Sequence, residues 1–211
     1  MAVAPTTSPQ SHPARARILQ AARTQLFAYG YTALTMDELA TELGVSKKTL
    51  YVHFPSKDTL VGEILRGFVG EIRTSADTLF SDRTLGFTVK LRRFTEAMVK
   101  RLQVNPHLFH DLQRSAPHLY QQVEELRHRN IPHVFGLLLR EGQAAGMVRA
   151  DIDPAFAVEF WRPAIQTLLH PASQERLQLT PDEIFSRAIQ LFFGGLLTPA
   201  GRQDHEKHFR P

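Results

Sequence analysis

Residues 35–57, TMDELATELGVSKKTLYVHFPSK, hold two helix starts and two helix stops in close succession. Thr35, with a glutamate three residues later, has the form of a capping box, so a first helix starts at position 36 and Gly44 ends it. Ser46 can cap a second helix, which Pro55 stops after about two turns. Two short helices joined by a tight turn make a helix-turn-helix.

The second short helix has a core side and an outward side. At about 100° per residue, Leu50 and Phe54 share one side of the helix. The outward side and its margins carry Lys47, Lys48, Thr49, Tyr51, Val52 and His53. An α-helix fits the major groove of DNA, where outermost side chains meet base edges and flanking ones meet phosphates. The pattern is typical of a recognition helix; a merely solvated lysine face is the alternative, but it leaves the caps and the tight turn unexplained.

Positive charge is concentrated in the first quarter of the chain. The 211 residues include 25 Lys or Arg and 21 Asp or Glu, which gives a formal net charge of +4. Residues 1–57 contain six basic and three acidic side chains, so most of the excess lies there. Lys57 stands at the start of the next helix, whose free N–H groups also favour a phosphate. The charge permits a polyanionic partner beside the helix-turn-helix.

The run from Ile18 to Leu65 resembles, without an internal gap, the DNA-binding domain of TetR/AcrR-type repressors. Residues 44–57 are the most specific part of that resemblance. The resemblance implies that the residues close to the bases or the adjacent backbone are Met36, Ser46, Lys48, Thr49 and Val52. It also implies that the phosphates are held by Tyr51, His53 and Lys57. The family often has glycine in place of Lys48 and an aromatic residue or histidine in place of Val52, so the operator sequence stays open.

Apolar spacing is helical along nearly the whole chain, and the predicted fold class is all-α with about nine helices. After the helix-turn-helix, helices are expected over residues 56–80, 84–103, 106–114, 117–145, 154–170 and 181–197. Pro132 and Pro163 fall inside two of these segments and should kink or split them.

The chain divides into four expected segments. Residues 1–12 are rich in Pro, Ser, Thr and Ala and are expected to be a disordered arm, and residues 201–211 a flexible tail. A three-helix DNA-binding domain is expected over residues 13–58. A larger helical domain for regulation, ligand binding and dimerisation is expected over residues 59–200.

The last two long helices are the candidate dimer interface, because the resemblance implies a four-helix interface there. Residues 181–197 carry an apolar stripe made of Phe185, Ile189, Phe192 and Leu196. A core helix buried within one protomer is the alternative. A homodimer is favoured because a two-turn recognition helix reads few base pairs, and two-fold symmetry doubles the site. Two such helices would lie about 34 Å apart, one turn of double-stranded operator DNA.

Aromatic residues are enriched in the larger domain, which is compatible with an apolar pocket for an unidentified small-molecule inducer. Of 14 phenylalanines, only Phe27 and Phe54 precede residue 66. The candidate lining residues are Phe87, Phe94, Phe109, Phe135, Phe160 and Trp161, although ordinary core packing is an alternative for each. An inducer would act by favouring a conformer that no longer fits the operator.

Histidines offer a rival hypothesis, a metal-responsive regulator. The larger domain contains His107, His110, His118, His128, His133 and His170. His107 and His110 are three residues apart with Asp111 beside them, which could form a shared metal site. The tail pair His205 and His208 has the wrong spacing for a zinc-protease motif. Scattered surface histidines are the commoner situation, and no metal site and no cofactor are predicted.

An enzyme is the remaining class, and the sequence disfavours it. The chain has no cysteine, no GxSxG elbow, no phosphate-binding P-loop and no GxGxxG unit after a strand, so no catalytic residue is assigned. No apolar run approaches the ~20 residues of a membrane span, and no signal peptide is evident, so a cytoplasmic location without a membrane partner is expected. The sequence therefore predicts a dimeric, ligand-responsive, sequence-specific transcription repressor.

Overall fold

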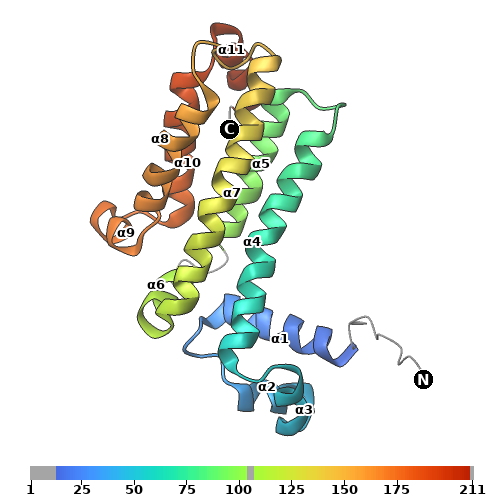
Figure 1. The fold of residues 1–211 in the computed structure, drawn as a ribbon. Coiled ribbons are helices and arrows are strands. Elements are labelled where there is room, and N and C mark those ends of the chain that lie inside the picture. Colours follow the sequence, from blue (N-terminus) through green and yellow to red (C-terminus); the bar gives the residue numbers. More distant parts are fainter. Residues whose placement is uncertain (1–12, 104–106, 210–211) are drawn as a thin grey trace, which may run out of the picture.

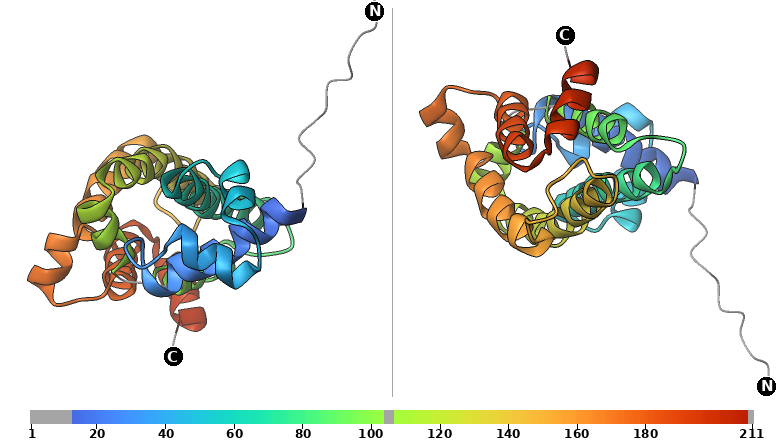
Figure 2. Two further views of the ribbon diagram at one scale, coloured as in Figure 1. Left: turned by 90° about the horizontal axis from the view of Figure 1, so that it is seen from below. Right: turned by 90° about the horizontal axis from the view of Figure 1, so that it is seen from above.

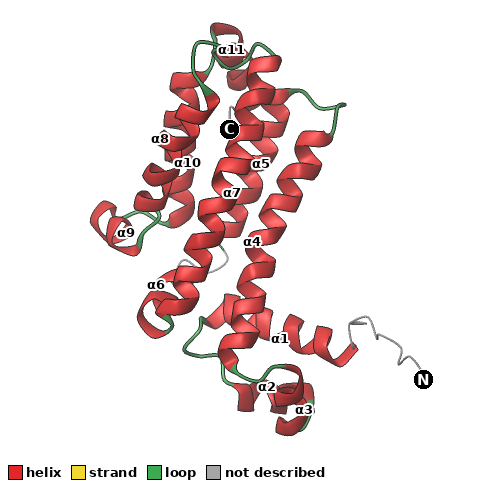
Figure 3. Ribbon diagram, in the orientation of Figure 1, coloured by secondary structure: helices red, strands yellow, loops and turns green. Residues whose placement is uncertain are grey.

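The computed structural model describes residues 13–103 and 107–209, and these residues are almost wholly helical (Figure 3). The DNA-binding candidate region contains α1 (Pro13–Tyr29), α2 (Met36–Leu43) and α3 (Lys47–His53). The remaining helices are α4 (Lys57–Ser81), α5 (Phe87–Leu102), α6 (Leu108–Ser115), α7 (Pro117–Ala144), α8 (Pro154–Leu168), α9 (Pro171–Leu177), α10 (Pro181–Leu196) and α11 (Pro199–Phe209). The all-α prediction is confirmed. Over the described ranges, no helix has the length and apolar character required to cross a membrane.

The helices form a small unit below a long bundle (Figure 1). Helices α1 to α3 gather at one end, and α4 runs from that unit along the bundle beside α7 and α5. Helices α8 and α10 lie side by side on the flank away from α4, which the views along the bundle also show (Figure 2). Helix α4 therefore connects the small unit directly to the bundle.

Two apolar cores divide the molecule at a different place from the predicted boundary at residue 58. The first core contains the buried faces of α1 to α3, the first half of α4, Leu108 and Leu112 of α6, and Leu119 and Val123 of α7. The second contains the far half of α7 with α5, α8 and α10. Helices α6 and α7 thus complete the core of the small unit, because the helices α1 to α3 alone bury too little apolar surface.

Side-chain caps start α2, α3 and α4 where the sequence predicts them. Thr35, Ser46 and Ser56 each precede a helix, and the hydroxyl of each accepts a hydrogen bond from the backbone N–H three residues later. Gly44 follows α2 with φ 64°, in the left-handed region that glycine adopts readily. Local chemistry therefore determines the ends of α2 and α3.

Helices α7 and α8 continue through Pro132 and Pro163 without splitting, and the kink that was the alternative stays a prediction. The segment expected over residues 154–170 ends at Leu168, and a separate α9 begins after His170, whose Nδ1 accepts from the N–H of Ala172 at 3.3 Å. A proline in the first turn after a capping side chain is a helix-start signal, so α9 was detectable.

The expected flexible tail is helical over most of its length. Helix α11 packs against α5 and starts at Pro199, where the Thr198 hydroxyl accepts from the N–H of Gly201 at 3.0 Å. The backbone of Gly201 lies so close to Met147 that a Cβ there would be 2.2 Å from the Met147 carbonyl oxygen. The predicted arm over residues 1–12 and the final residues 210–211 lie outside the described residues.

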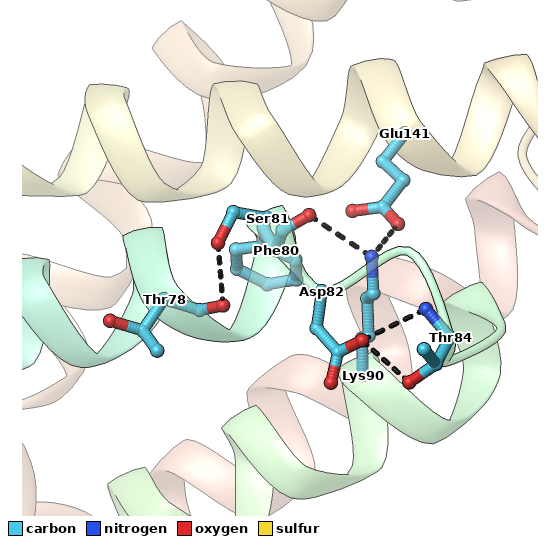
Figure 4. A network of polar contacts seen from close by, with 7 residues as sticks. All are labelled: Thr78, Phe80, Ser81, Asp82, Thr84, Lys90 and Glu141. Atoms are coloured by element: carbon cyan, nitrogen blue, oxygen red, sulfur yellow. Dashed lines mark hydrogen bonds and ion pairs between the residues drawn. The ribbon is translucent and has the colours of Figure 1, made fainter.

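A buried cation ties three helices together at the far end of the bundle (Figure 4). The Lys90 side chain is 3% exposed, donates to the Phe80 carbonyl at 3.0 Å and forms an ion pair with Glu141. These contacts join α5 to the last turn of α4 and to α7. In the following loop the Asp82 carboxylate accepts from the N–H and hydroxyl of Thr84 at 2.8 and 2.6 Å. The end of α4 is consequently fixed to the bundle.

Candidate nucleic-acid interface

Helix α3 presents its outward side to solvent. Leu50 and Phe54 are 0% exposed and anchor the helix in the core, whereas Val52 is 72% exposed. Lys48 and Thr49 are exposed as well. The predicted orientation of α3 is confirmed, and its contact with base edges stays a prediction.

Ser46 and Thr49 are engaged with each other at the start of α3. The Ser46 hydroxyl accepts from the Thr49 N–H at 3.0 Å, and the two hydroxyl oxygens are 2.8 Å apart. Ser46 therefore acts first as the helix cap. Its hydroxyl can still approach a neighbouring phosphate, because a hydroxyl offers one donor and two lone pairs.

Lys47, at the edge of the outward side of α3, forms an ion pair within the protein. Its Nζ lies 2.6 Å from Asp37 of α2, and both side chains are more than half exposed. An exposed ion pair of this kind contributes only about 0.2–1 kcal/mol, so Lys47 can exchange the carboxylate for a phosphate at small cost. The shared apolar core, with Leu39 and Leu50, keeps α2 and α3 together without this pair.

Met36 has a buried side chain at the start of α2, and its predicted closeness to the DNA stays a prediction. The residue is 7% exposed and belongs to the core with Leu39 and Leu50. Its side chain is turned inward, because the first turn of α2 needs an apolar contact to seat it. Around Met36 the side chains of Thr35, Asp37 and Glu38 are exposed, so the start of α2 can still lie beside a nucleic acid.

Tyr51, His53 and Lys57 lie around the far end of α3. Tyr51 is 45% exposed, and His53 and Lys57 are half-buried. The Lys57 ammonium lies 4.0 Å from the centre of the Tyr31 ring. Burial lowers the pKa of Lys57, while the carboxylates of Asp111 and Asp58 oppose that shift. These positions fit the phosphate contacts that were predicted, and the contacts themselves stay untested.

A second polar cluster joins the DNA-binding unit to α6 and α7. The Tyr31 hydroxyl donates to Asp58 at 2.6 Å, and His118 of α7 lies 2.9 Å from the other oxygen of that carboxylate. Burial, followed by the hydrogen bond to Asp58, raises the pKa of Tyr31 to about 12. The Tyr31 hydroxyl therefore stays protonated at neutral pH and can donate its hydrogen bond to Asp58.

Asp111 of α6 binds the loop after α1. Its carboxylate accepts from the backbone N–H of Thr32 at 2.8 Å and from the Thr32 hydroxyl at 2.5 Å. Gly30 has φ 92°, and a Cβ there would lie 2.8 Å from the same carboxylate. The sequence offered Asp111 as a possible metal ligand and missed this contact, because residues so far apart in sequence carry no shared local signal.

The histidine hypothesis gains no support from these positions. Within residues 13–103 and 107–209 no three side chains of the metal-binding types come together as a possible site. The Asp111 carboxylate is occupied by Thr32 and Ser115. His170 caps α9 and faces Gln113, and His133 pairs with Asp77.

An apolar cavity of about 100 Å³ lies in the bundle between α4, α5, α6, α7, α8 and α10. Four of the predicted residues line it: Phe94, Phe109, Phe135 and Trp161. Two predicted residues do not. Phe87 packs instead on Gly142 and Phe193, and Phe160 is 63% exposed on the outer side of α8. Helical spacing identified aromatic residues but not which of them face the same space.

The flank formed by α8 and α10 exposes a second apolar surface. Phe156, Phe160 and Leu191 are 69%, 63% and 83% exposed and border a groove between the two helices. The stripe predicted for dimerisation turns inward, since Phe185, Ile189 and Phe192 are at most 9% exposed, as is Leu196. That stripe packs mainly into the core of the protomer, but Phe192 and Leu196 also line the groove, so its part in dimerisation stays a prediction.

Known proteins with similar sequences are transcriptional regulators with a helix-turn-helix. Residues 18–64 match the family model of bacterial regulatory proteins, tetR family. The HTH-type transcriptional repressor KstR2 of Mycolicibacterium smegmatis is 28% identical over 171 residues, which cover 76% of this chain and 80% of that protein. The HTH-type transcriptional regulator UidR of Escherichia coli is 24% identical over 194 residues, covering 90% and 95%.

Solved structures share the fold over nearly the whole chain. A transcriptional regulator from Cytophaga hutchinsonii superposes with a TM-score of 0.67 at 17% identity, covering 89% of this chain and all of the other. Regulatory protein TetR from Rhodobacter sphaeroides gives a TM-score of 0.63 at 21% identity, covering 88% and 100%. The small unit and the bundle thus recur together in other regulators.

Proposed function

The chain is a DNA-binding transcriptional regulator of the TetR type, and we propose that it is a homodimeric repressor released from a palindromic operator by a small molecule. Residues 13–58 are assigned to operator binding, and residues 59–200 to ligand binding and dimerisation. The observation that carries the proposal is the exposed outward side of α3 on a helix whose other side is fully buried. When bound to its operator, the protein would lie on the bacterial chromosome in the cytoplasm.

We assign base contacts to the outermost side chains of α3. Lys48 can donate to guanine O6 and N7, Thr49 can bond a base or a phosphate, and Val52 can pack on a thymine methyl. Phosphates are assigned to Lys47, Ser46, Tyr51, His53 and Lys57. Phosphate contacts position the helix, and base contacts specify the sequence.

The exposed face of α8 and α10 supports the homodimer. Three large apolar side chains stand in solvent around one groove, and such patches on soluble proteins mark interaction sites. An interface there with its two-fold axis along the bundle would place two copies of α3 at the same end of the dimer, as a two-fold symmetric operator requires.

Helix α6 supports the link between ligand and operator. Phe109 lines the cavity, and Asp111, two residues later, holds the loop that precedes α2. A ligand that displaces Phe109 therefore moves the support of the helix-turn-helix. Coupling requires only that the ligand bind the two conformers with different affinities.

Base-preference selection with Lys48→Ala tests the operator assignment. The variant should lose about 1–3 kcal/mol of discrimination at one position of each half-site, because one bidentate donor is removed. Lys57→Ala should weaken all sequences alike and reduce the salt dependence by about one unit of slope. Lys100→Ala, an exposed lysine on α5, is the matched control and should change neither quantity. Unchanged affinity and preference in Lys48→Ala would show that α3 does not face the bases.

A further inference from the structure

The cavity in the bundle has an apolar wall with two cationic side chains and no anionic one. Arg101 of α5 and Arg127 of α7 are lining residues, and no Asp or Glu lines the cavity among the described residues. We propose that its ligand is a compact aromatic carboxylate, a single ring with an anionic head. This inference rests on the proposed function, since it names the ligand class of the regulatory site.

Arg127 is held in place before any ligand arrives. Its guanidinium lies 4.2 Å from the centre of the Phe109 ring, and Nη1 donates to Glu124 at 2.7 Å. That contact uses one of five N–H groups, and the planar fork matches a carboxylate in bidentate geometry. Glu124 and Phe109 therefore orient Arg127 while leaving donors for an anion.

Arg101 supplies the second cation from the end of α5. Its Nη2 donates to the Ser75 hydroxyl at 3.1 Å, which is a neutral partner. Glu71, the nearby carboxylate on α4, is paired with Arg23; that hydrogen bond is the main cause of its lowered pKa, and the charge of Arg101 is a smaller cause. Arg23 and Arg127 balance the charges of Glu71 and Glu124. The charge of Arg101 is the excess that favours an anion in the cavity.

The remaining wall suits a flat ring. The ring centres of Phe135 and Trp161 are 4.8 Å apart, and Phe94 meets Phe135 edge-on at 6.0 Å. Aromatic groups gain from such offset and edge contacts beyond the burial of area. The Trp161 indole N–H is buried without a partner among the described residues, so a lining residue also offers an unused donor.

Size restricts the body of the ligand. An engineered apolar cavity of about 150 Å³ binds benzene, and this cavity measures about 100 Å³. A single ring therefore needs only a modest outward movement of the wall, where Met98 is a flexible lining residue. A long alkyl chain or a fused ring system would need far more.

Fluorescence titration of the intact protein tests the proposal directly, because Trp161 is the one tryptophan of the chain. The probes are benzoate, its neutral methyl ester, the cation benzylamine, and octanoate as an acyl-chain acid. Benzoate should bind about ten-fold tighter than the ester, since charge-assisted hydrogen bonds are roughly twice as strong as neutral ones. Benzylamine should bind more weakly than the ester.

Substitution of each arginine tests whether Arg127 and Arg101 bind the carboxylate of the ligand. Arg127→Gln and Arg101→Gln should each weaken benzoate binding by about ten-fold and leave binding of the methyl ester within about two-fold. Retained ester binding shows that the cavity is intact in each variant. Arg129→Gln, at an exposed position on α7, is the matched control and should alter neither titration.

Several results overturn the proposal: equal affinity for benzoate and its ester, unchanged benzoate binding in both cavity variants, no binding of benzoate, or octanoate binding about ten-fold tighter than benzoate. An operator-shift assay with the unliganded protein distinguishes failure of the ligand-class proposal from failure of the proposed repressor function. Intact operator binding that benzoate binding does not alter would contradict release by a ligand while leaving the ligand class standing.

Discussion

Asp111 is the residue through which α6 holds the loop before α2. Its half-buried carboxylate accepts three protein hydrogen bonds, two from Thr32 and one from the Ser115 hydroxyl. Burial by itself would raise the pKa of Asp111, but the hydrogen bonds from Thr32 and Ser115 outweigh it, and the pKa is lowered. The ionised form is therefore part of the folded state.

Asp111→Asn should lower the free energy of unfolding by about 1–2 kcal/mol at pH 7, because a charge-assisted acceptor is replaced by a neutral amide. A lowered folded pKa gives stability that is present above the ordinary value of 3.8 and is lost as the pH falls through the lowered value. The wild type and the variant should thus converge in urea unfolding below pH 3.8. Glu125→Gln, at an exposed position on α7, should change little at either pH.

Gly30 gives a second prediction at the same contact. Gly30→Ala should destabilise the protein by about 1–3 kcal/mol, because φ 92° is strained for alanine and its Cβ would meet Asp111 at 2.8 Å. Gly70→Ala is the contrast, in the interior of α4 with no atom within 4 Å of its Cβ. It should stabilise by about 0.5–1 kcal/mol. Equal thermal midpoints for the two variants would refute the contact.

The sequence predicted correctly whether a residue of α3 points inward or outward. It predicted less well which distant residues a side chain contacts. Helical periodicity placed Leu50 and Phe54 inward and Val52 outward, because the angle between residues on one helix is fixed. It misplaced Phe87 and Phe160, since which helix covers a given face depends on packing between distant segments. Met36 was carried over from a family resemblance and proved to be a core residue.

At the scale of whole helices, starts were predictable wherever a capping side chain stands before the first turn. Thr35, Ser46 and Ser56 identified three helices. Pro132 and Pro163 did not end α7 and α8, since a long packed helix tolerates the loss of one backbone donor. Helix α11 was missed because its polar composition resembles that of a solvated tail, and its packing on α5 has no local signature.

The ion pair between Lys90 and Glu141 should be the most sensitive polar contact between the helices of the bundle. Lys90→Met should lower the free energy of unfolding by about 3 kcal/mol, because it strands a carboxylate and the Phe80 carbonyl. The loss is at the low end of the range for buried pairs because Glu141 is 27% exposed. Arg92→Met breaks the exposed pair with Glu96 on the same helix and should cost less than about 0.5 kcal/mol. Guanidinium unfolding of the two variants compares them.

At the scale of the whole molecule, the apolar face of α8 and α10 is the feature that needs a partner. Leu191 is the most exposed large apolar residue in the described part of the chain. Leu191→Glu should raise the dimer dissociation constant by about thirty-fold or more, the effect of burying a charge in a central contact. Light scattering across a dilution series measures it.

Tyr29→Glu serves as the control for the dimer prediction. Tyr29 is 74% exposed on α1, outside the groove between α8 and α10, and its substitution should leave the mass unchanged. Dissociation of Leu191→Glu should also reduce operator affinity, since two linked recognition helices bind better than one. A Leu191→Glu protein that stays dimeric would move the interface elsewhere.

The fixed end of α4 has a mechanical consequence. Lys90 anchors the carbonyl of Phe80, while Lys57 begins the same helix about 35 Å away at 1.5 Å per residue. Val69, at the cavity wall, lies halfway between them. If α4 rotates as a rigid rod about its anchored end, Lys57 is displaced about twice as far as Val69, because it lies about twice as far from that end. The helix is a lever with a mechanical advantage set by where the cavity sits along it, so a shift of one ångström beside the ligand becomes about two ångströms at the DNA.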